Sequence, residues 1–344
     1  MIRTAVGAIA LTFAIAHTVP AGAVVPGAAA VNTAALVEGL PGAATGRVVT
    51  DTFWAAALGT RKEVRIYLPP SYDAQPKRRF PVVYHLHGWS GSERNWVDVG
   101  RLDAIADSLI GRGMPEMIIV MPDGDDSWYT TWNTLENFAA CRRDSVRTEP
   151  ASSYCVAWPH YDDYIVHDVV THVDRRYRTK ADRGHRGIAG LSMGGFGAIT
   201  LALNHPEAFA AAASHSGVLT PGAPGDTAAA RLDDSTRLSR LRAAYGSIWP
   251  SLALAFGRDT TSWMARDPAR IVRRLKHANA QRPALYIDIG LQDRLLRQNR
   301  AFHAELNSLG VGHVYREVPG AHNWAYWKRN LPESLTWMGS LIAK

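Results

Sequence analysis

The chain has 344 residues, of which 47% are hydrophobic and 20% are charged, and its formal net charge is +7. This balance is typical of a soluble globular protein and excludes a largely disordered chain. The length suits one large α/β domain or two modest ones.

The first residues have the three parts of a secretory signal peptide. Arg3 precedes an apolar run at residues 5–16, and small residues follow up to Ala23. This pattern predicts a signal peptide over residues 1–23 and a secreted protein. A membrane anchor is the alternative, but the apolar run is short for crossing a bilayer. Residues 24–46, rich in alanine and glycine with almost no charge, are predicted to form a flexible lead-in.

From residue 47 onward, strand-like and helix-like segments alternate along the chain. The strand-like runs end at glycine or proline, and the helix-like runs have apolar residues at helical spacing. The predicted strands are residues 63–70, 80–88, 117–124, 186–190, 210–217, 284–290 and 312–320. The predicted helices are residues 101–113, 164–177, 193–209, 299–310 and a last helix from about Leu331.

This alternation predicts a mostly parallel sheet with helices on both faces, in one catalytic domain over residues 47–344. Residues 220–282 have no clear strand and exceed a normal crossover, so we expect a small partial cap over the carboxyl edge of the sheet. The basic run at residues 270–282 has no interleaved aromatics and is interpreted as the solvated face of a helix. We therefore expect no nucleic-acid partner, whereas association with an anionic cell wall or membrane surface fits the positive charge.

The chain has two cysteines, Cys141 and Cys155. In an exported protein, such a pair most simply forms one disulfide bond. Closing a loop of this size would stabilise the fold by about 3 kcal/mol in the chain-entropy account. The sequence contains no C-x-x-C redox or zinc motif.

The stretch from Gly190 to Gly194 is a G-x-S-x-G motif between a predicted strand and a predicted helix. In this motif the serine lies on a strained strand-to-helix turn, and its neighbours must be small to avoid collision. Ser192 is therefore a candidate nucleophile. The alternative is that its side chain only caps the following helix.

Two further reactive residues follow predicted strands, at the sheet edge where loops carry function. Asp293 comes after the strand at residues 284–290, and His322 comes after the last strand and a Pro-Gly turn. Asp288 is a competing acid, but it lies within the strand and reaches less easily across the edge. The chain order serine, aspartate, histidine is that of the α/β-hydrolases and favours a catalytic triad.

A serine nucleophile also needs N–H groups aimed at the developing oxyanion. We expect one from Met193, the residue after the nucleophile, and one from Trp89, in the loop after residues 80–88. His85 and His87 could be misread as a metal pair, but no third ligand at sensible spacing accompanies them. No metal or organic cofactor is expected.

The loop after residues 117–124 carries both acidic and aromatic residues. Its acidic residues lack the ligand pattern and the terminal glutamate of a calcium loop, so we interpret them as an ordinary strand exit. Its aromatic residues are candidate walls of a substrate pocket, although core packing explains each of them equally well. These residues are Trp128, Tyr129 and Trp132.

Together these motifs resemble the esterase D branch of the α/β-hydrolases. This branch includes tributyrin esterases, S-formylglutathione hydrolases, some feruloyl esterases and the mycolyltransferases of mycobacterial cell walls. The resemblance extends from about Arg47 to the C-terminus and rests on LHGWSGSERNW, MPDGDDSWYTTW, GLSMGGFGAITLALNHPEAFAAAASHSG, YIDIGLQDRLLRQNRAF and PGAHNWAYW. It implies triad roles for Ser192, Asp293 and His322, and oxyanion roles for Met193 and Trp89.

Departures from the branch favour a simple esterase. Mycolyltransferases typically have Asp-Gly where this chain has His87 and Gly88, and a glutamate where Asp293 stands. The cytosolic S-formylglutathione hydrolases do not fit the predicted export signal. We therefore expect a secreted serine carboxylesterase acting on small-molecule, glycan or lipid esters with short-chain, acetyl or feruloyl groups. The alternatives are an acyltransferase that uses a sugar or glycerol hydroxyl, and a non-catalytic wall-binding protein.

Overall fold

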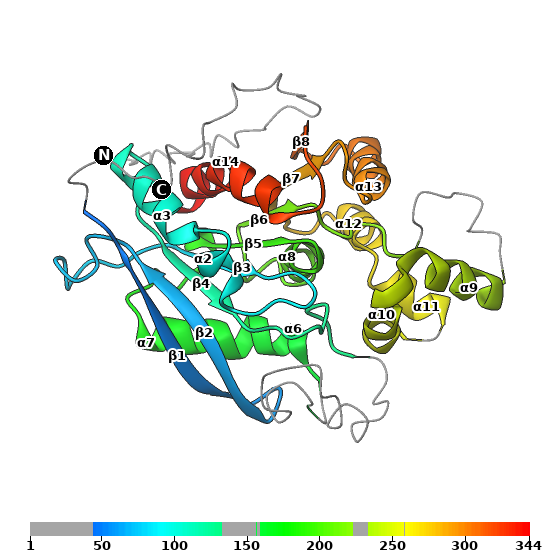
Figure 1. Ribbon diagram of the computed structural model, residues 1–344, viewed down its shortest axis with the longest axis horizontal. Coiled ribbons are helices and arrows are strands. Elements are labelled where there is room, and N and C mark those ends of the chain that lie inside the picture. Colours follow the sequence, from blue (N-terminus) through cyan, green and yellow to red (C-terminus); the bar gives the residue numbers. More distant parts are fainter. Residues whose placement is uncertain (1–43, 133–155, 157–158, 223–232, 258) are drawn as a thin grey trace, which may run out of the picture.

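The computed structural model describes residues 44–132, 156, 159–222, 233–257 and 259–344 (Figure 1). The predicted signal peptide, most of the predicted lead-in, and the predicted Cys141–Cys155 disulfide lie outside these residues. The first strand begins at Arg47, where the sequence places the start of the catalytic domain. Within the described ranges, no helix is both long enough and apolar enough to cross a membrane.

An eight-stranded sheet forms the centre of the described structure. The strand bounds are β1 (Arg47–Ala55), β2 (Thr60–Leu68), β3 (Val82–Leu86), β4 (Ile118–Pro122), β5 (Arg186–Leu191), β6 (Ala211–His215), β7 (Ala284–Gly290) and β8 (Val314–Val318). Their spatial order is β1-β2-β4-β3-β5-β6-β7-β8. The strands β3 to β8 are mutually parallel, and β1 and β2 form an antiparallel hairpin at one edge. The expected mostly parallel sheet is confirmed.

Helices cover both faces of this sheet (Figure 1). Their bounds are α2 (Asn95–Asp98), α3 (Leu102–Gly111), α6 (Tyr161–Asp163), α7 (Val170–Arg176), α8 (Met193–Asn204), α9 (Asp234–Tyr245), α10 (Trp249–Phe256), α11 (Thr260–Ala265), α12 (Pro268–His277), α13 (Leu296–Ser308) and α14 (Trp324–Ile342). A π-helical turn, Tyr164–Val169, joins α6 to α7, and 3₁₀ turns occupy Arg183–His185 and Gly246–Ile248. The helices α3 and α14 pack on one face, and α7, α8, α12 and α13 pack on the other.

The central strands are buried along their whole length. Every residue of β3 and β4 is buried, as expected for parallel strands covered on both faces. Side chains alternate between the two layers, so that Val83 packs toward α3 and α14 while Val82 and Tyr84 pack toward α7 and α8. These strands are recognisable in the sequence as short apolar runs, because both faces of the sheet are covered and their side chains are buried.

Two of the differences from the sequence expectations have a clear physical reason. The sequence pattern does not predict β1, since this edge strand is mostly exposed or half-exposed and lacks a strong apolar signal. The last helix begins at Trp324 rather than near Leu331, because the Asn323 side chain accepts the N–H of Tyr326 at 3.0 Å and caps it. The helix then continues through Pro332, which usually breaks a helix interior.

The predicted cap at residues 220–282 divides into two parts. The helices α9, α10 and α11 extend away from the sheet (Figure 1), and Tyr245 at the end of α9 lines the cavity described below. By contrast, α12 packs against α8 and α13 as a flanking helix, so the cap is shorter than expected. Ile271 and Val272 of α12 are buried and its basic residues are exposed, which confirms the predicted solvated face.

An aromatic cluster holds the cap together. Trp263 of α11 is buried and stacks on Trp249, with ring centroids 5.5 Å apart. The same indole contacts the rings of Phe256 and Tyr245, and its N–H donates to the carbonyl of Gly257 at 2.8 Å. The cap therefore has a small core of its own, centred on Trp263.

We expect Trp263→Ala to lower the free energy of unfolding by about 3–5 kcal/mol, because it empties a buried site and leaves a carbonyl without its donor. Urea denaturation followed by circular dichroism measures this loss. The matched control is Trp54→Ala, since Trp54 on β1 is 60% exposed and its loss should cost about 0.5 kcal/mol or less. Equal losses in the two variants would contradict the central place of Trp263.

Candidate active site

The strand β5 and the helix α8 meet at Ser192 in a turn of a single residue. Ser192 has φ 53° and ψ −114°, a conformation that non-glycine residues rarely adopt. A Cβ on Gly190 would lie 2.3 Å from the carbonyl oxygen of Gly194, and one on Gly194 would lie 2.4 Å from that of Leu86. Both positions have room for glycine alone, and the Ser192 side chain remains partly exposed at the sheet edge.

The side chains of Ser192, His322 and Asp293 form one hydrogen-bonded chain. The Ser192 hydroxyl donates to His322 Nε2 at 2.9 Å, and Nδ1 of the same ring donates to Asp293 Oδ2 at 2.8 Å. The serine hydroxyl thus bonds to the imidazole and not to an N–H of the described helix α8. The structure brings together three residues that the sequence places at three separate strand exits.

Hydrogen bonds join the loop that carries Asp293 to the loop that carries His322. The N–H of Gln292 donates to the carbonyl of Gly320 at 2.9 Å, and the Gln292 side chain accepts the N–H of Gly320 at 2.7 Å. A Cβ on Gly290 would lie 2.2 Å from the same Gly320 oxygen, so the two strand exits approach closely. This pairing fixes the distance between the carboxylate and the imidazole.

Asp293 is buried, yet its carboxylate is well supplied with donors. Burial alone would raise its pKa, but the hydrogen bond from His322 and the N–H of Leu295, 2.8 Å from Oδ1, hold the pKa of Asp293 below its usual value. The group is therefore an anion at neutral pH, able to orient the imidazole and stabilise its charged form. Its contribution to stability is present above the unfolded pKa and is lost as the pH falls through the lower folded pKa.

The competing acid, Asp288, lies beside a different histidine. Its carboxylate is 2.6 Å from Nδ1 of His215 and accepts from the hydroxyl of Tyr326 at 2.8 Å. Nε2 of His215 is in turn 2.9 Å from the hydroxyl of Ser334 on α14. All of these side chains are buried, so the geometry agrees with the preference for Asp293.

Met193 and Trp89, the expected oxyanion donors, both neighbour the serine. Met193 is the first residue of α8, so its N–H has no partner within the helix. Trp89 lines the same cavity as Ser192, and a Cβ added to the adjacent Gly88 would lie 3.5 Å from the Ser192 Cβ. The placement of both residues is compatible with the expected role.

A cavity of about 410 Å³ opens over Ser192 and His322. Of the three aromatic residues considered as pocket walls, Trp128 lines it, whereas Tyr129 and Trp132, both in the described part of the chain, do not. The Tyr129 hydroxyl instead donates to the carbonyl of His87 at 3.0 Å, and the Trp132 indole donates to that of Ser127 at 3.2 Å. These two residues support the loops behind the cavity.

Several residues that line the cavity were not predicted from the sequence. Tyr245 and Ile248 come from the cap, and Arg294 and Gln298 come from the start of α13 and the turn before it. A charged residue directly after the candidate acid is the one signal that could have pointed to Arg294. The cap residues carry no motif, since their place in the wall depends on tertiary packing.

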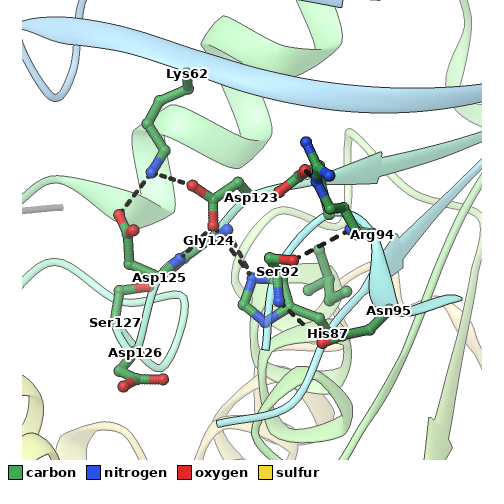
Figure 2. Close-up of polar contacts among 12 residues, drawn as sticks. Lys62, His87, Ser92, Arg94, Asn95, Asp123, Gly124, Asp125, Asp126 and Ser127 are labelled. Atoms are coloured by element: carbon green, nitrogen blue, oxygen red, sulfur yellow. Dashed lines mark hydrogen bonds and ion pairs between the residues drawn. The ribbon is translucent and has the colours of Figure 1, made fainter. Parts of the chain in front are cut away.

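A buried ion cluster supports the loop after β4 (Figure 2). Lys62 Nζ donates to Asp123 Oδ2 at 2.5 Å and to Asp125 Oδ2 at 2.7 Å. The Tyr161 hydroxyl also donates to Asp125, at 2.5 Å. Although burial opposes both shifts, the two carboxylates raise the pKa of Lys62, and Lys62 holds the pKa of Asp123 well below its usual range. A lysine thus lies between these carboxylates, and no group of His, Cys, Asp and Glu in the described ranges is arranged to hold a metal ion.

The parallel sheet with this strand order, with a serine on a strained turn after β5, defines an α/β-hydrolase. The chain belongs to the family described as "Putative esterase", whose family model matches residues 55–338. The resemblance that the sequence motifs indicate is therefore confirmed at the level of the family.

Known proteins match this chain over different spans. An endo-1,4-beta-xylanase/feruloyl esterase of Xylanibacter ruminicola is 29% identical over 168 residues, covering 48% of this chain and 20% of that protein. An esterase of Mycobacterium tuberculosis is 27% identical over 292 residues, covering 78% of this chain and 54% of that protein. The chain thus spans about half or less of the length of these curated relatives. The solved structure of a ferulic acid esterase has a TM-score of 0.64 and 25% identity, covering 87% of this chain and 99% of that one.

We expect Lys62→Met to lower the free energy of unfolding by about 3–5 kcal/mol near pH 8, because Asp123 and Asp125 would remain buried without their cation. Burial already raises the pKa of Asp125 to about 6 in the wild type, and without Lys62 the folded pKa of Asp123 would also rise above its unfolded value. The loss should therefore shrink as the pH falls toward about 5. Urea denaturation at both pH values measures this trend.

The control for this variant is Lys77→Met, which removes an exposed lysine from a loop. Surface substitutions of this kind change stability by about 0.5 kcal/mol or less. If Lys62→Met cost no more than Lys77→Met, or if its loss grew as the pH fell, the stabilising role of the ion cluster would be wrong.

Proposed function

We propose that the protein is a secreted serine carboxylesterase. The observation that carries this proposal is the hydrogen-bonded chain from Ser192 through His322 to Asp293 beside a cavity of about 410 Å³. Membership of the esterase family and similarity to proteins named feruloyl esterase and esterase support the same activity.

The first half of the proposed reaction forms an acyl-enzyme. The Ser192 hydroxyl attacks the ester carbonyl while His322 Nε2 accepts its proton, and Asp293 keeps the ring in the required tautomer. The N–H groups of Met193 and Trp89 stabilise the oxyanion of the tetrahedral intermediate. His322 then gives its proton to the departing alcohol, which leaves the acyl group on Ser192.

The second half releases the acid. A water molecule gives a proton to His322 as it attacks the acyl-enzyme carbonyl, and the second tetrahedral intermediate uses the same oxyanion donors. Collapse of this intermediate returns the proton from His322 to Ser192 and frees the carboxylic acid. Every step uses side chains and backbone groups of this chain, and none calls for a metal or an organic cofactor.

The cavity lining supports a small or aromatic acyl group. Its volume of about 410 Å³ lies toward the lower end of ordinary ligand pockets, and Trp89, Trp128, Trp324 and Trp327 contribute to its walls. We infer short-chain, acetyl and feruloyl esters as the substrate class, with the alcohol supplied by a small molecule or a glycan. The residues predicted as an export signal, 1–23, support action outside the cell.

We expect Ser192→Ala to lower kcat for p-nitrophenyl acetate by about 10⁴-fold or more while the protein stays folded, because the nucleophile is lost. Ester hydrolysis and circular dichroism measure the two parts of this expectation. Ser308→Ala, which alters an exposed serine on α13, serves as the control and should retain full activity. Near wild-type hydrolysis by Ser192→Ala would overturn the proposed function.

We also expect hydrolysis to dominate over acyl transfer, since an aspartate and a His-Gly pair stand where mycolyltransferases typically have other residues. With a long-chain acyl donor and added glycerol or trehalose, thin-layer chromatography should show the free acid as the main product. An acylated sugar or glycerol well above the hydrolysis background would favour the acyltransferase instead.

A further inference from the structure

His87 lies directly after β3 and is completely buried, at the base of the loop that carries Trp89. Its ring lies between two backbone groups (Figure 2). The N–H of Gly124 donates to Nε2 at 2.9 Å, and Nδ1 is 2.9 Å from the carbonyl oxygen of Gly88. No step of the proposed mechanism uses this imidazole.

The two backbone contacts fix which ring nitrogen carries the proton. A peptide N–H can only donate, so Nε2 of the neutral His87 ring accepts from Gly124. Although burial opposes the shift, Asp123, whose Oδ1 is 3.6 Å from the same nitrogen, raises the pKa of His87. In the neutral ring, Nδ1 then carries the hydrogen and donates to Gly88. In the opposite tautomer, the Nε2 hydrogen would face the N–H of Gly124, and the Nδ1 lone pair would face the carbonyl oxygen of Gly88. Both contacts would be repulsive.

The carbonyl that His87 holds belongs to the same peptide unit as the N–H of Trp89. In a planar trans peptide the C=O and the following N–H point in opposite directions, so holding the Gly88 oxygen also aims the Trp89 N–H. The Gly88 oxygen accepts a second bond from the N–H of Gly91 at 3.0 Å, and Ser90 has φ 60° in the turn between them. Both donors lie on one side of this peptide unit.

The Gly88 backbone lies close to the catalytic serine. A Cβ on Gly88 would lie 2.6 Å from Leu191 Cδ1 and 3.5 Å from Ser192 Cβ, so the backbone passes directly beside the strained turn. We propose that His87 is a positioning residue, which aims the N–H of Trp89 at the oxyanion by donating from Nδ1 to the Gly88 carbonyl. This inference rests on the proposed serine esterase function.

The surrounding structure holds His87 itself in place. Gly124 lies between Asp123 and Asp125, and Asp123 Oδ1 accepts the N–H of Asp125 at 3.2 Å, which sets the turn that presents the Gly124 N–H. Both acids bind Lys62, as described above. The Tyr129 hydroxyl also holds the carbonyl of His87. The ion cluster therefore supports the oxyanion loop through Gly124 and His87.

Two substitutions of His87 each retain one of the two hydrogen bonds of the ring and remove the other. In His87→Asn, the carboxamide nitrogen can take the place of Nδ1 and still donate to Gly88, whereas the acceptor for Gly124 is lost. In His87→Gln, the longer side chain can place its oxygen near Nε2 and accept from Gly124, whereas the donor to Gly88 is lost. His87→Leu removes both bonds.

We expect His87→Gln and His87→Leu to lower kcat for p-nitrophenyl acetate by about 10²–10³-fold, the effect of losing one oxyanion donor. His87→Asn should stay within about tenfold of the wild type. KM should change little in all three, because the donor acts mainly in the transition state. Rates are measured at a temperature where melting curves show every variant folded.

The matched control is His85→Gln. His85 is a buried histidine within β3, and neither of its ring nitrogens has a hydrogen-bond partner in the described part of the chain. Burial lowers the pKa of His85 to about 3, so it is a neutral packing residue at working pH. Its substitution should lower the melting temperature and leave the kcat of the folded protein unchanged.

Four outcomes decide the matter. A kcat for His87→Asn well above that of His87→Gln, with His85→Gln unaffected, supports the positioning role. Equal kcat values for His87→Asn and His87→Gln, or losses confined to KM or to the folded fraction, overturn it. If Ser192→Ala is inactive while His87→Gln has full activity, the positioning role alone fails. If Ser192→Ala remains active, the proposed function fails and this inference fails with it.

Discussion

The backbone of Ser192 is the constraint on which the rest of the site depends. Its positive φ is held because Gly190 and Gly194 allow the turn to close, and because the Ser192 N–H donates to the carbonyl of His215 at 2.9 Å on the neighbouring strand β6. A relaxed turn would move the hydroxyl away from His322 and the start of α8 away from the cavity. The sheet therefore supports a conformation that the segment alone would not keep.

The described residues include two sets of Asp, His and Ser side chains that differ in their surroundings rather than in residue type. Asp288, His215 and Ser334 are all buried, and the Ser334 hydroxyl donates to the carbonyl of Leu331 within α14. Ser334 does not line the cavity over Ser192, and its hydroxyl proton is directed to the helix backbone. The hydroxyl of Ser192 faces a cavity and points its proton at an imidazole. Access and proton direction, and not the residue types, distinguish the proposed catalytic chain from the buried set.

The sequence predicts the parts of this site that depend on local rules. Three features can be found directly in the sequence, because each depends on short local segments. They are the ends of the strands, the small residues around Ser192, and the order of the acid and the base. Lys62 is not recognisable in this way. The alternation of β2 places it on the inward face with Val64 and Ile66, but no local rule shows which groups would neutralise a buried lysine. Its burial follows from two aspartates that approach it from another loop. The cap residues Tyr245 and Ile248 escaped for the same reason.

The position of Lys62 gives the edge hairpin an unexpected part in the molecule. Edge strands are commonly the least cooperative part of a sheet and open locally without unfolding the centre. Here Lys62 of β2 forms ion pairs with Asp123 and Asp125 in the loop after β4. If β2 separated from β4, these ion pairs would be lost, so the hairpin does not open independently of that loop. The edge of the sheet and the loop after β4, which carries the cavity residue Trp128, thus belong to one cooperative unit.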